Sequence, residues 1–359
     1  VDGINGVLII NPDDTVLAEY RGHMREYKNR KRALNKLKKT AATTEDGLNI
    51  ELLANIESTE DIKQLHGAGA DGVGLFRSEY LYLNRDTLPT EDEQYEVYST
   101  LIKKLKGKQL TIRTVDLGVD KNPRWFGQNA SPNGSLNPAL GLTGIRLCLA
   151  EPVMFRTQMR AILRAAAHGK VNMMWPMVAS LTELRQCIVH FETAKRQLAE
   201  RGEEYGEVSL GCMIEIPSAA LTVGSLLKLV DFISIGTNDL IQYTLSVDRG
   251  DDSVSHLYQP GHPAVLKLLQ HIIRTANRMG KSVSVCGEMA GDSTYTRLLL
   301  GMGLRRFSMN PSNLLTIKDI VLRSHTGRLE EESARLMRNE DPEKTDKLLK
   351  DLNKMDEAV

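Results

Sequence analysis

Short apolar runs recur along the chain from Gly47 onward, and each is followed by a polar turn and an amphipathic, helix-like segment. Apolar runs of this length, bounded by turn residues, are typical of strands that are buried in a parallel sheet. The runs cover residues 48–56, 70–77, 109–116, 171–178, 208–215, 230–237, 282–289 and 306–310. Eight strand-then-helix units in one chain predict an α/β fold, a closed (β/α)8 TIM barrel.

An open, doubly wound sheet is the alternative that the same alternation allows. Such a sheet more often carries a glycine-rich nucleotide fingerprint after its first strand. The segment after residues 48–56 contains no such fingerprint. With 359 residues, the chain also has the length that one barrel of typical size requires. Both observations favour the barrel.

Two segments lie outside the eight units. Residues 6–11 predict a short strand that ends another module, and residues 13–40 predict a basic helix that acts as a linker. A docking surface is the alternative role for this helix, although runs of charge are usually solvated faces. We therefore divide the chain into residues 1–40, a barrel over 41–325 and a charged helical tail over 326–359.

Charge and cysteine content exclude several classes of function. Lys plus Arg and Asp plus Glu both number 46, so no overall basic field attracts nucleic acid or an anionic membrane. The first residues do not form a signal peptide, no run approaches membrane-spanning length, and the start at Val1 indicates a processed or excised fragment. The four cysteines show no C-x-x-C spacing, so neither a zinc site nor a disulfide framework is indicated. We expect a soluble, cytoplasmic protein.

Polar residues stand at the carboxyl ends of most of the predicted strands. In a barrel these ends meet at one face, and active sites are built there. The residues concerned are Arg77, Arg113, Asp116, Glu215, Asn238, Asp239, Cys286, Glu288 and Asn310. The sequence therefore predicts a functional site at the carboxyl-terminal face of the barrel.

Two of these residues, Glu215 and Asp239, follow adjacent strands. Two protein carboxylates, with water and substrate in the remaining positions, form the usual site for Mg²⁺, and Mn²⁺ is the second candidate. The alternative is a pair of hydrogen-bonded carboxylates without a metal. The number of other polar strand ends favours the metal site.

Positive charge is predicted on the opposite side of the same site. Arg77 and Arg113 end strands, while Arg249 and Lys121 lie on adjoining loops. Guanidinium groups bind phosphate and carboxylate oxygens through two parallel hydrogen bonds, although any single arginine could instead form a structural salt bridge. Three arginines together indicate a phosphorylated or carboxylated small molecule, and such a set stabilises the charge that moves in phosphoryl transfer.

Cys286 ends the seventh run, and Gly287 after it allows a tight turn that leaves the thiol open to a ligand. Such a thiol acts as a nucleophile or as a general acid–base group. No histidine is paired with it by spacing, which weakens the nucleophile option. The other cysteines, Cys148, Cys187 and Cys212, lie in apolar segments and are expected to fill core space.

Six segments of the chain carry a specific resemblance to a known family. They are GLFRSEYLY (74–82), DTLPTEDEQ (86–94), IRTVD (112–116), GCMIEIP (211–217), SIGTNDLIQYTLSVDRG (234–250) and CGEMAGD (286–292). Together they resemble the Enzyme I family, the phosphoenolpyruvate–protein phosphotransferases of the bacterial sugar phosphotransferase system. The wider family includes pyruvate phosphate dikinase and phosphoenolpyruvate synthase, but residues 248–260 and the stretch around Asp86 resemble Enzyme I more closely.

The resemblance implies a role for each candidate residue. Glu215 and Asp239 would bind Mg²⁺ at the substrate. Cys286 would donate a proton to C3 of the enolate and so give pyruvate. The residues that would contact phosphoenolpyruvate are Arg77, Arg113, Asn238 and Arg249, with assistance from Lys121. The family also implies a homodimer formed by this half of the protein.

Two positions depart from the family pattern. Thr143, within residues 141–144, stands where the family usually has an arginine, and threonine cannot supply its charge. Val119, within residues 118–121, stands where the family has a second glycine. Both changes bear on affinity or rate, while the metal ligands and the acid are retained.

The largest departure concerns the histidine that accepts the phosphoryl group in this family. It lies in a Gly-Gly-x-x-(Ser/Thr)-His motif of an N-terminal domain, and none of the eight histidines here has such surroundings. We therefore expect the carboxyl-terminal half of an Enzyme I, in which residues 1–11 resemble the last strand of the missing domain. Such a half would bind phosphoenolpyruvate, and transfer to the carrier HPr would need the missing domain.

Three alternatives stay open on the sequence alone. The first is a barrel like that of pyruvate phosphate dikinase or phosphoenolpyruvate synthase. The second is a module that senses phosphoenolpyruvate or 2-oxoacids and dimerises without turnover, an option that Thr143 strengthens. The third is the nitrogen-related paralogue of Enzyme I, which differs mainly in an N-terminal sensory domain.

Overall fold

A computed structural model describes residues 1–3, 6–118 and 137–354 of the chain. The chain divides into two compact units, Val1–Thr40 and Ala41–Val359. The second unit contains all of the named strands and most of the helices. The assignment of separate roles to the segments of the chain stays a prediction.

The first unit is built around one long helix, α1 (Asp14–Lys36), followed by the 3-10 turn η1 (Leu37–Lys39). The side chain of Asp13 caps the helix because it accepts a hydrogen bond from the backbone N–H of Val16 at 2.8 Å. The basic helix predicted over residues 13–40 is therefore confirmed. None of its residues is buried.

The short strand predicted over residues 6–11 is not formed. Val7 makes one antiparallel bridge with Asp2, and residues 8–11 pair with no described strand. Leu8 and Ile10 are exposed. An extended segment needs neighbouring strands on which to bury its apolar side chains, and the described part of this unit provides none.

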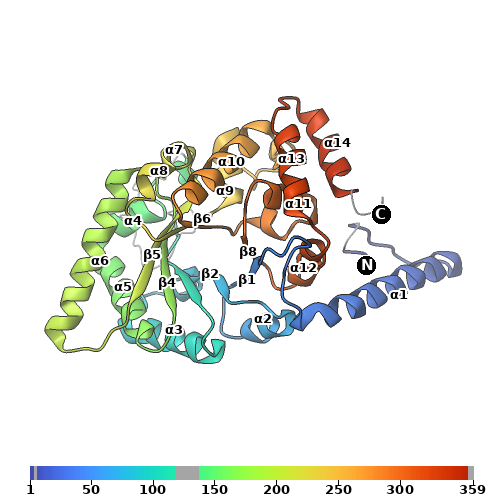
Figure 1. Cartoon of the computed structure of the whole chain (residues 1–359). Helices are drawn as coiled ribbons and strands as arrows, with labels where there is room; N and C mark the ends of the chain where they lie inside the picture. Colours follow the sequence, from blue (N-terminus) through green and yellow to red (C-terminus); the bar gives the residue numbers. More distant parts are fainter. Residues whose placement is uncertain (4–5, 119–136, 355–359) are drawn as a thin grey trace. The chain divides into compact units, whose positions relative to one another are not determined.

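The second unit is a closed barrel of eight parallel strands (Figure 1). The strands are β1 (Glu51–Ile56), β2 (Val73–Arg77), β3 (Leu110–Arg113), β4 (Val171–Trp175), β5 (Val208–Ile214), β6 (Phe232–Ile235), β7 (Ser282–Val285) and β8 (Arg306–Met309). Neighbours in the sequence are neighbours in the barrel, and β1 closes it by pairing with β8, with Ala54 opposite Met309. Every predicted run contains a strand, so the (β/α)8 prediction is confirmed.

Helices surround the strands and form the outer layer of the barrel (Figure 1). They are α2 (Ile62–Ala68), α3 (Glu91–Leu105), α4 (Ile145–Ala150), α5 (Pro152–Ala166), α6 (Leu181–Arg201), α7 (Pro217–Leu221), α8 (Val223–Leu226), α9 (Thr237–Leu245), α10 (Pro263–Arg278), α11 (Ser293–Gly301) and α12 (Leu314–Leu322). Short 3-10 turns are η2 (Ser78–Leu81), η5 (Pro138–Leu140), η6 (Ser255–Leu257) and η7 (Glu288–Gly291). No described helix combines the length and the apolar character that crossing a membrane requires.

The strands end earlier than the apolar runs suggest. At β6 this difference changes the element on which two candidate site residues lie. Strand β6 ends at Ile235, whereas the predicted run reaches Thr237. Thr237 begins α9, so Asn238 and Asp239 lie in the first turn of a helix rather than at the end of a strand. A carboxylate in the first turn complements the positive end of the helix dipole. The pattern could not locate this boundary, because Gly236 and Thr237 fit either element.

The charged tail is helical, as predicted, and it packs on the outer layer of the barrel. Helices α13 (Thr326–Leu336) and α14 (Pro342–Asn353) both contact α11. Their buried residues include Leu329, Leu336, Leu349 and Leu352. Arg297 of α11 also donates a hydrogen bond to the backbone carbonyl of Asn353 at 3.0 Å. These contacts make both helices part of the second unit.

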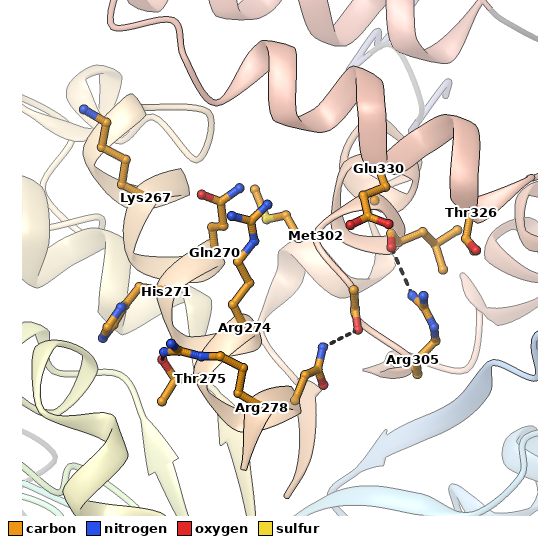
Figure 2. Close-up of a pocket in the computed structure, with 14 residues that line it drawn as sticks. Lys267, Gln270, His271, Arg274, Thr275, Arg278, Met302, Arg305, Thr326 and Glu330 are labelled. Atoms are coloured by element: carbon orange, nitrogen blue, oxygen red, sulfur yellow. Dashed lines mark hydrogen bonds between the residues drawn. The ribbon is translucent and has the colours of Figure 1, made fainter. Parts of the chain in front are cut away.

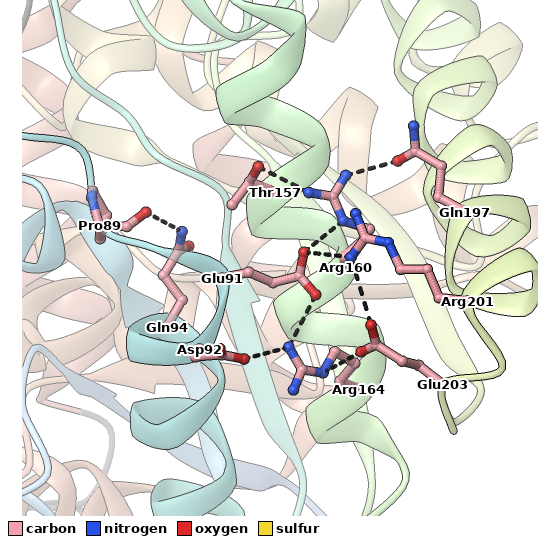
Figure 3. A network of polar contacts seen from close by, with 10 residues as sticks. All are labelled: Pro89, Glu91, Asp92, Gln94, Thr157, Arg160, Arg164, Gln197, Arg201 and Glu203. Carbon is pink, nitrogen blue, oxygen red and sulfur yellow. Dashed lines mark hydrogen bonds and ion pairs between the residues drawn. The ribbon is translucent and has the colours of Figure 1, made fainter.

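A network of ion pairs ties α3, α5 and α6 together (Figure 3). Glu91, in the first turn of α3, accepts hydrogen bonds from Arg160 at 2.6 Å and from Arg164 at 3.0 Å, both on α5. Arg201 of α6 donates to the same carboxylate at 3.2 Å. Burial raises the pKa of Glu91, but the guanidinium groups lower it more, so its pKa lies below its usual value.

We expect Glu91→Gln to lower the free energy of unfolding by about 3 kcal/mol, because it leaves the guanidinium group of Arg160, whose side chain is 10% exposed, without its carboxylate. Asp92→Asn is the matched control, since Asp92 is 78% exposed and surface ion pairs contribute about 0–1 kcal/mol. Because the folded pKa of Glu91 is lowered, its contribution is present above the unfolded pKa and is lost as the pH falls through the folded pKa. Urea denaturation followed by circular dichroism measures these effects. Equal losses in the two variants would contradict this account of the network.

Candidate active site

A cavity of about 790 Å³ opens where the carboxyl ends of several strands meet. Three of the predicted residues, Arg77, Asn238 and Cys286, line this cavity. Glu288 and Asn310, which were also predicted from strand ends, line it as well. The barrel therefore brings residues that are far apart in the sequence to one face, as the strand-end pattern indicates.

The other described candidates, Arg113, Asp116, Glu215, Asp239 and Arg249, are not among the residues that line this cavity. Two observations show that they lie close to one another. The charge of Asp239 raises the pKa of Glu215, and an ion-pair contact links Asp239 to Arg249. The charges of Glu215 and Arg113 also act on the thiol of Cys286, which lines the cavity. The candidates therefore form one site, in which some residues line the cavity and the others form a charged cluster beside it.

Glu215 follows β5 directly, and its side chain is buried. Its Oε1 accepts a hydrogen bond from the backbone N–H of Met177 at 2.6 Å. Its Oε2 is also buried, and no described residue donates a hydrogen bond to it. Burial raises the pKa of Glu215 well above its usual value, the carboxylates of Asp239 and Asp116 raise it further, and Arg113 offsets only part of this. A carboxylate buried in this way is stabilised by a cation.

Backbone geometry makes room for this carboxylate. Met177 has a φ of 55°, which is uncommon for a residue other than glycine, and its N–H is the one that reaches Glu215. A Cβ at Gly236 would lie 2.5 Å from Oε2 of Glu215. A Cβ at Gly144 would lie 2.7 Å from Cγ of Met177 and 3.0 Å from Oδ1 of Asp116. Side chains at either glycine would therefore disturb the acidic cluster.

Arg113 ends β3 and is held among carboxylates. Its Nη2 donates to Oε1 of Glu79 at 3.0 Å, and its Nη1 lies 2.9 Å from Oδ2 of Asp116. Burial alone would lower the pKa of Arg113, but Glu79, Asp116 and Glu215 together raise it above its usual value. Arg113 is therefore charged, and it forms the structural salt bridges that were the alternative for any single arginine.

Two other guanidinium groups are more open to solvent. Arg77 ends β2, pairs with Glu57 at 2.5 Å and has a side chain that is 40% exposed. Arg249 lies 4.0 Å from Asp239, and its side chain is 44% exposed. An anion from solvent could reach both groups and compete with their carboxylate partners. Lys121, the fourth predicted cation, lies outside the described residues.

Asn238 and Glu288 fix each other through two hydrogen bonds between α9 and η7. Nδ2 of Asn238 donates to Oε1 of Glu288 at 3.2 Å, and the backbone N–H of Glu288 donates to Oδ1 of Asn238 at 2.9 Å. The hydroxyl of Tyr258 donates to the backbone carbonyl of Asn238 at 3.5 Å. The amide of Asn238 is therefore held in a defined orientation at the cavity wall.

Cys286 follows β7 directly and is only 3% exposed, although it lines the cavity. Its thiol donates a hydrogen bond to the backbone carbonyl of Ile235 at 3.5 Å. Burial raises the pKa of Cys286 to about 11, even though a hydrogen bond with Ser234 and the charge of Arg113 each lower it in part. At neutral pH the sulfur keeps its proton. The site therefore suits a proton donor better than a thiolate nucleophile.

Asn55 and Ser308 are residues of this site that the sequence analysis missed. Nδ2 of Asn55 donates to the backbone carbonyl of Cys286 at 3.0 Å, and the Ser308 hydroxyl donates to Oδ1 of Asn55 at 2.6 Å. This chain of hydrogen bonds joins β8, β1 and the residue that carries the thiol. A signal was present, since Asn55 is a polar residue near the carboxyl end of the apolar run 48–56.

The comparison with protein families gives the class of this barrel. The model of the family described as "PEP-utilising enzyme, PEP-binding domain" matches residues 31–326, where PEP is phosphoenolpyruvate. The chain belongs to this family. The match begins within α1 and extends to the start of α13, so it covers every strand of the barrel.

Curated relatives give a more particular likeness. The phosphoenolpyruvate-protein phosphotransferase of Cupriavidus necator is 50% identical over 354 residues, which are 98% of this chain and 60% of that protein. The protein of the same name from Staphylococcus carnosus is 43% identical over 336 residues, 93% of this chain and 58% of its own length. The chain thus spans about three fifths of the length of these relatives. A citrate lyase structure from Burkholderia xenovorans covers 89% of this chain and 94% of its own at 13% identity and a TM-score of 0.48, which supports no conclusion.

We expect iodoacetamide to alkylate Cys286 slowly at neutral pH and about tenfold faster for each pH unit up to about 11, because only the thiolate reacts. Mass spectrometry of quenched samples measures the rate. Cys286→Ser is the control, since it reports any labelling of the other three cysteines, which are buried. A rate that levels off above about pH 9, as for an unperturbed thiol with a pKa of about 8.5, would contradict the assigned environment.

Proposed function

We propose that this chain binds phosphoenolpyruvate together with a divalent cation, as the catalytic half of an Enzyme I of the bacterial sugar phosphotransferase system. One observation carries the proposal: Oε2 of Glu215 is buried without a hydrogen-bond donor among the described residues. The negative charges of Asp239 and Asp116 further raise the pKa of Glu215. Membership of the family and the names of the relatives support phosphoenolpyruvate as the substrate.

Glu215 and Asp239 are the proposed ligands of Mg²⁺, with Mn²⁺ as the second candidate. Carboxylate oxygens are the ligands that these hard cations prefer. The described part of the chain holds no group of three or more His, Cys, Asp or Glu side chains arranged for a metal ion. Water and substrate would therefore complete the coordination. When bound, the cation would supply positive charge for the enolate oxygen of the substrate.

The cations of the site are the proposed partners of the phosphate and carboxylate of phosphoenolpyruvate. Among the described cations Arg77 and Arg249 are the most accessible, and Arg113 supplies buried charge beside Glu215. Asn238 would offer its fixed amide to a ligand oxygen. Lys121 is proposed to assist on the basis of the resemblance alone.

Cys286 is the proposed donor of a proton to C3 of the enolate. Its raised pKa of about 11 keeps the proton on sulfur at neutral pH, and Asn55 holds its backbone carbonyl. The thiolate that remains would be reprotonated before the next turnover. By microscopic reversibility, the same group would remove a proton from the methyl group of bound pyruvate.

The steps beyond this chain belong to the proposal for the whole protein. The phosphoryl group would pass to a histidine that this sequence does not contain, and from there to the carrier HPr. A homodimer and a cytoplasmic location are also proposed, and the family resemblance is their support. A dikinase-like or synthase-like role is less well supported, because the relatives described above are named phosphotransferases.

Exchange of the methyl protons of pyruvate with solvent tests this chemistry on the 359-residue chain without a phosphoryl acceptor. In D₂O with Mg²⁺, we expect the protein to catalyse loss of the methyl signal in proton NMR spectra. Cys286→Ala should slow the exchange at least about 100-fold, a typical contribution of general acid–base catalysis. Cys187→Ala, which changes a buried cysteine of α6, should retain it. Exchange that survives in Cys286→Ala would contradict the assigned acid.

Thr143 provides a test of the cationic side of the site. Its backbone forms a bridge with Gly118, and the adjoining Gly144 lies against Asp116; Val119 lies outside the described residues. We expect Thr143→Arg to tighten phosphoenolpyruvate binding about tenfold, because it adds a guanidinium group beside the ligand. Thr193→Arg on α6 adds the same charge elsewhere and should change the affinity less than about twofold. Calorimetric titration of both variants measures this, and equal affinities would place Thr143 away from the ligand.

A further inference from the structure

Helix α10 carries a stripe of basic residues and no acidic residue. Its sequence, PAVLKLLQHIIRTANR, contains neither aspartate nor glutamate. Lys267, His271, Arg274 and Arg278 follow one another at intervals of four, three and four residues, which places them on one face of the helix. All four are exposed. The like charges of Arg274 and Arg278, four residues apart, repel each other, so this part of the stripe is destabilising unless negative charge lies nearby.

This stripe forms one wall of a cavity of about 700 Å³ (Figure 2). The opposite wall comes from the end of α11, the segment before β8 and the start of α13, and includes Met302, Arg305, Thr326 and Glu330. The cavity shares no lining residue with the one at the carboxyl ends of the strands. The two cavities are therefore separate.

Few carboxylates balance the positive charge around this cavity. Lys267 pairs with Glu340 at 2.6 Å, and Glu330 is the acidic residue among those that line the cavity. Arg274 has neither an ion pair nor a side-chain hydrogen bond with any described residue. Asp46 is a third carboxylate nearby, because it accepts hydrogen bonds from Thr326 of the cavity wall. Four basic side chains of lysine and arginine thus lie near three carboxylates, which leaves an excess of one positive charge.

Arg305 adds a less solvated cation to the same space. Its Nη1 donates to the backbone carbonyl of Leu300 at the end of α11, at 3.0 Å, and to that of Leu304 in the segment before β8, at 2.9 Å. Burial lowers the pKa of Arg305, and the charges of Asp46 and Glu330 offset this only in part. A guanidinium group that has lost part of its hydration without forming an ion pair gains from a bound anion.

Interaction with helix ends accounts for part of this arrangement but not for the whole. Arg278 lies in the last turn of α10, where a cation stabilises the negative end of the helix dipole. Lys267 and His271 lie well before that turn, so the dipole does not explain them. The helix dipole also does not explain why the basic stripe and Arg305, from opposite walls, face the same cavity.

We propose that this cavity, between α10, α11 and α13, binds the phosphate group of a small metabolite. Guanidinium groups favour phosphate oxygens because they donate two parallel hydrogen bonds, and the basic side chains around the cavity outnumber the carboxylates. Gln270 and Asn277 line the same cavity and supply neutral hydrogen-bonding groups. Leu300 and Met302 give it an apolar part, which suits the organic portion of such a ligand.

Calorimetric titration of the 359-residue protein with inorganic pyrophosphate, in buffer that contains a chelator and no divalent cation, tests the proposal. The test variant is Arg274→Gln/Arg278→Gln, and the matched control is Arg185→Gln/Arg196→Gln, which removes two exposed arginines from α6. Because both pairs are exposed, neither change should unfold the protein. We expect saturable binding that weakens at least about tenfold in the test variant and less than about twofold in the control.

Three outcomes would overturn the proposal. The absence of saturable binding up to about 10 mM would show that the stripe is only a solvated basic face. Equal weakening in the test and control variants would indicate a response to net charge alone. Binding that persists in the test variant but is lost in Arg77→Gln would assign the anion to the cavity at the strand ends. Thermal unfolding with pyrophosphate gives a second readout, because a bound ligand should raise the melting temperature of the control more than that of the test variant.

Discussion

A buried carboxylate with too little positive charge around it is the constraint on which the candidate active site depends. Glu215 has one oxygen bound to the N–H of Met177 and one buried oxygen without a donor among the described residues. The unusual backbone of Met177 and the absence of a side chain at Gly236 both serve this arrangement. Such features destabilise a protein, and the proposed divalent cation would offset that cost by pairing with the buried carboxylate.

The barrel arranges the chemistry of the site as two environments that lie close together. Its rim carries the partly exposed guanidinium groups of Arg77 and Arg249, which suit an anionic substrate. Its interior carries Cys286, whose burial keeps the sulfur protonated, and Asn55 fixes that residue from the neighbouring strand. A substrate that spans both environments would have its charges bound at the rim and its reacting carbon facing the acid.

Sequence could predict the fold and most of the candidate residues because barrel closure forces all strand ends to one face. The apolar runs predicted every strand, and polar residues such as Glu215 and Cys286 indicated where the strands end. The sequence could not predict that Asn238 and Asp239 lie in the first turn of a helix, since Gly236 and Thr237 fit a strand or a helix equally well. The hydrogen bond from Asn55 to Cys286 was also hidden, because it joins residues that only the closed barrel brings together. Likewise, the basic stripe of α10 is visible in the sequence, whereas its opposite wall is not.

The most direct test of the central claim is calorimetric titration of phosphoenolpyruvate with and without Mg²⁺, on the native chain and on Glu215→Gln. Glu200→Gln, an exposed change on α6, is the control for the loss of one carboxylate. The account predicts binding that requires Mg²⁺, that weakens about 10- to 100-fold in Glu215→Gln and that is unchanged in the control. Equal binding without Mg²⁺, or native affinity in Glu215→Gln, would contradict the claim that the buried carboxylate holds the cation at the substrate.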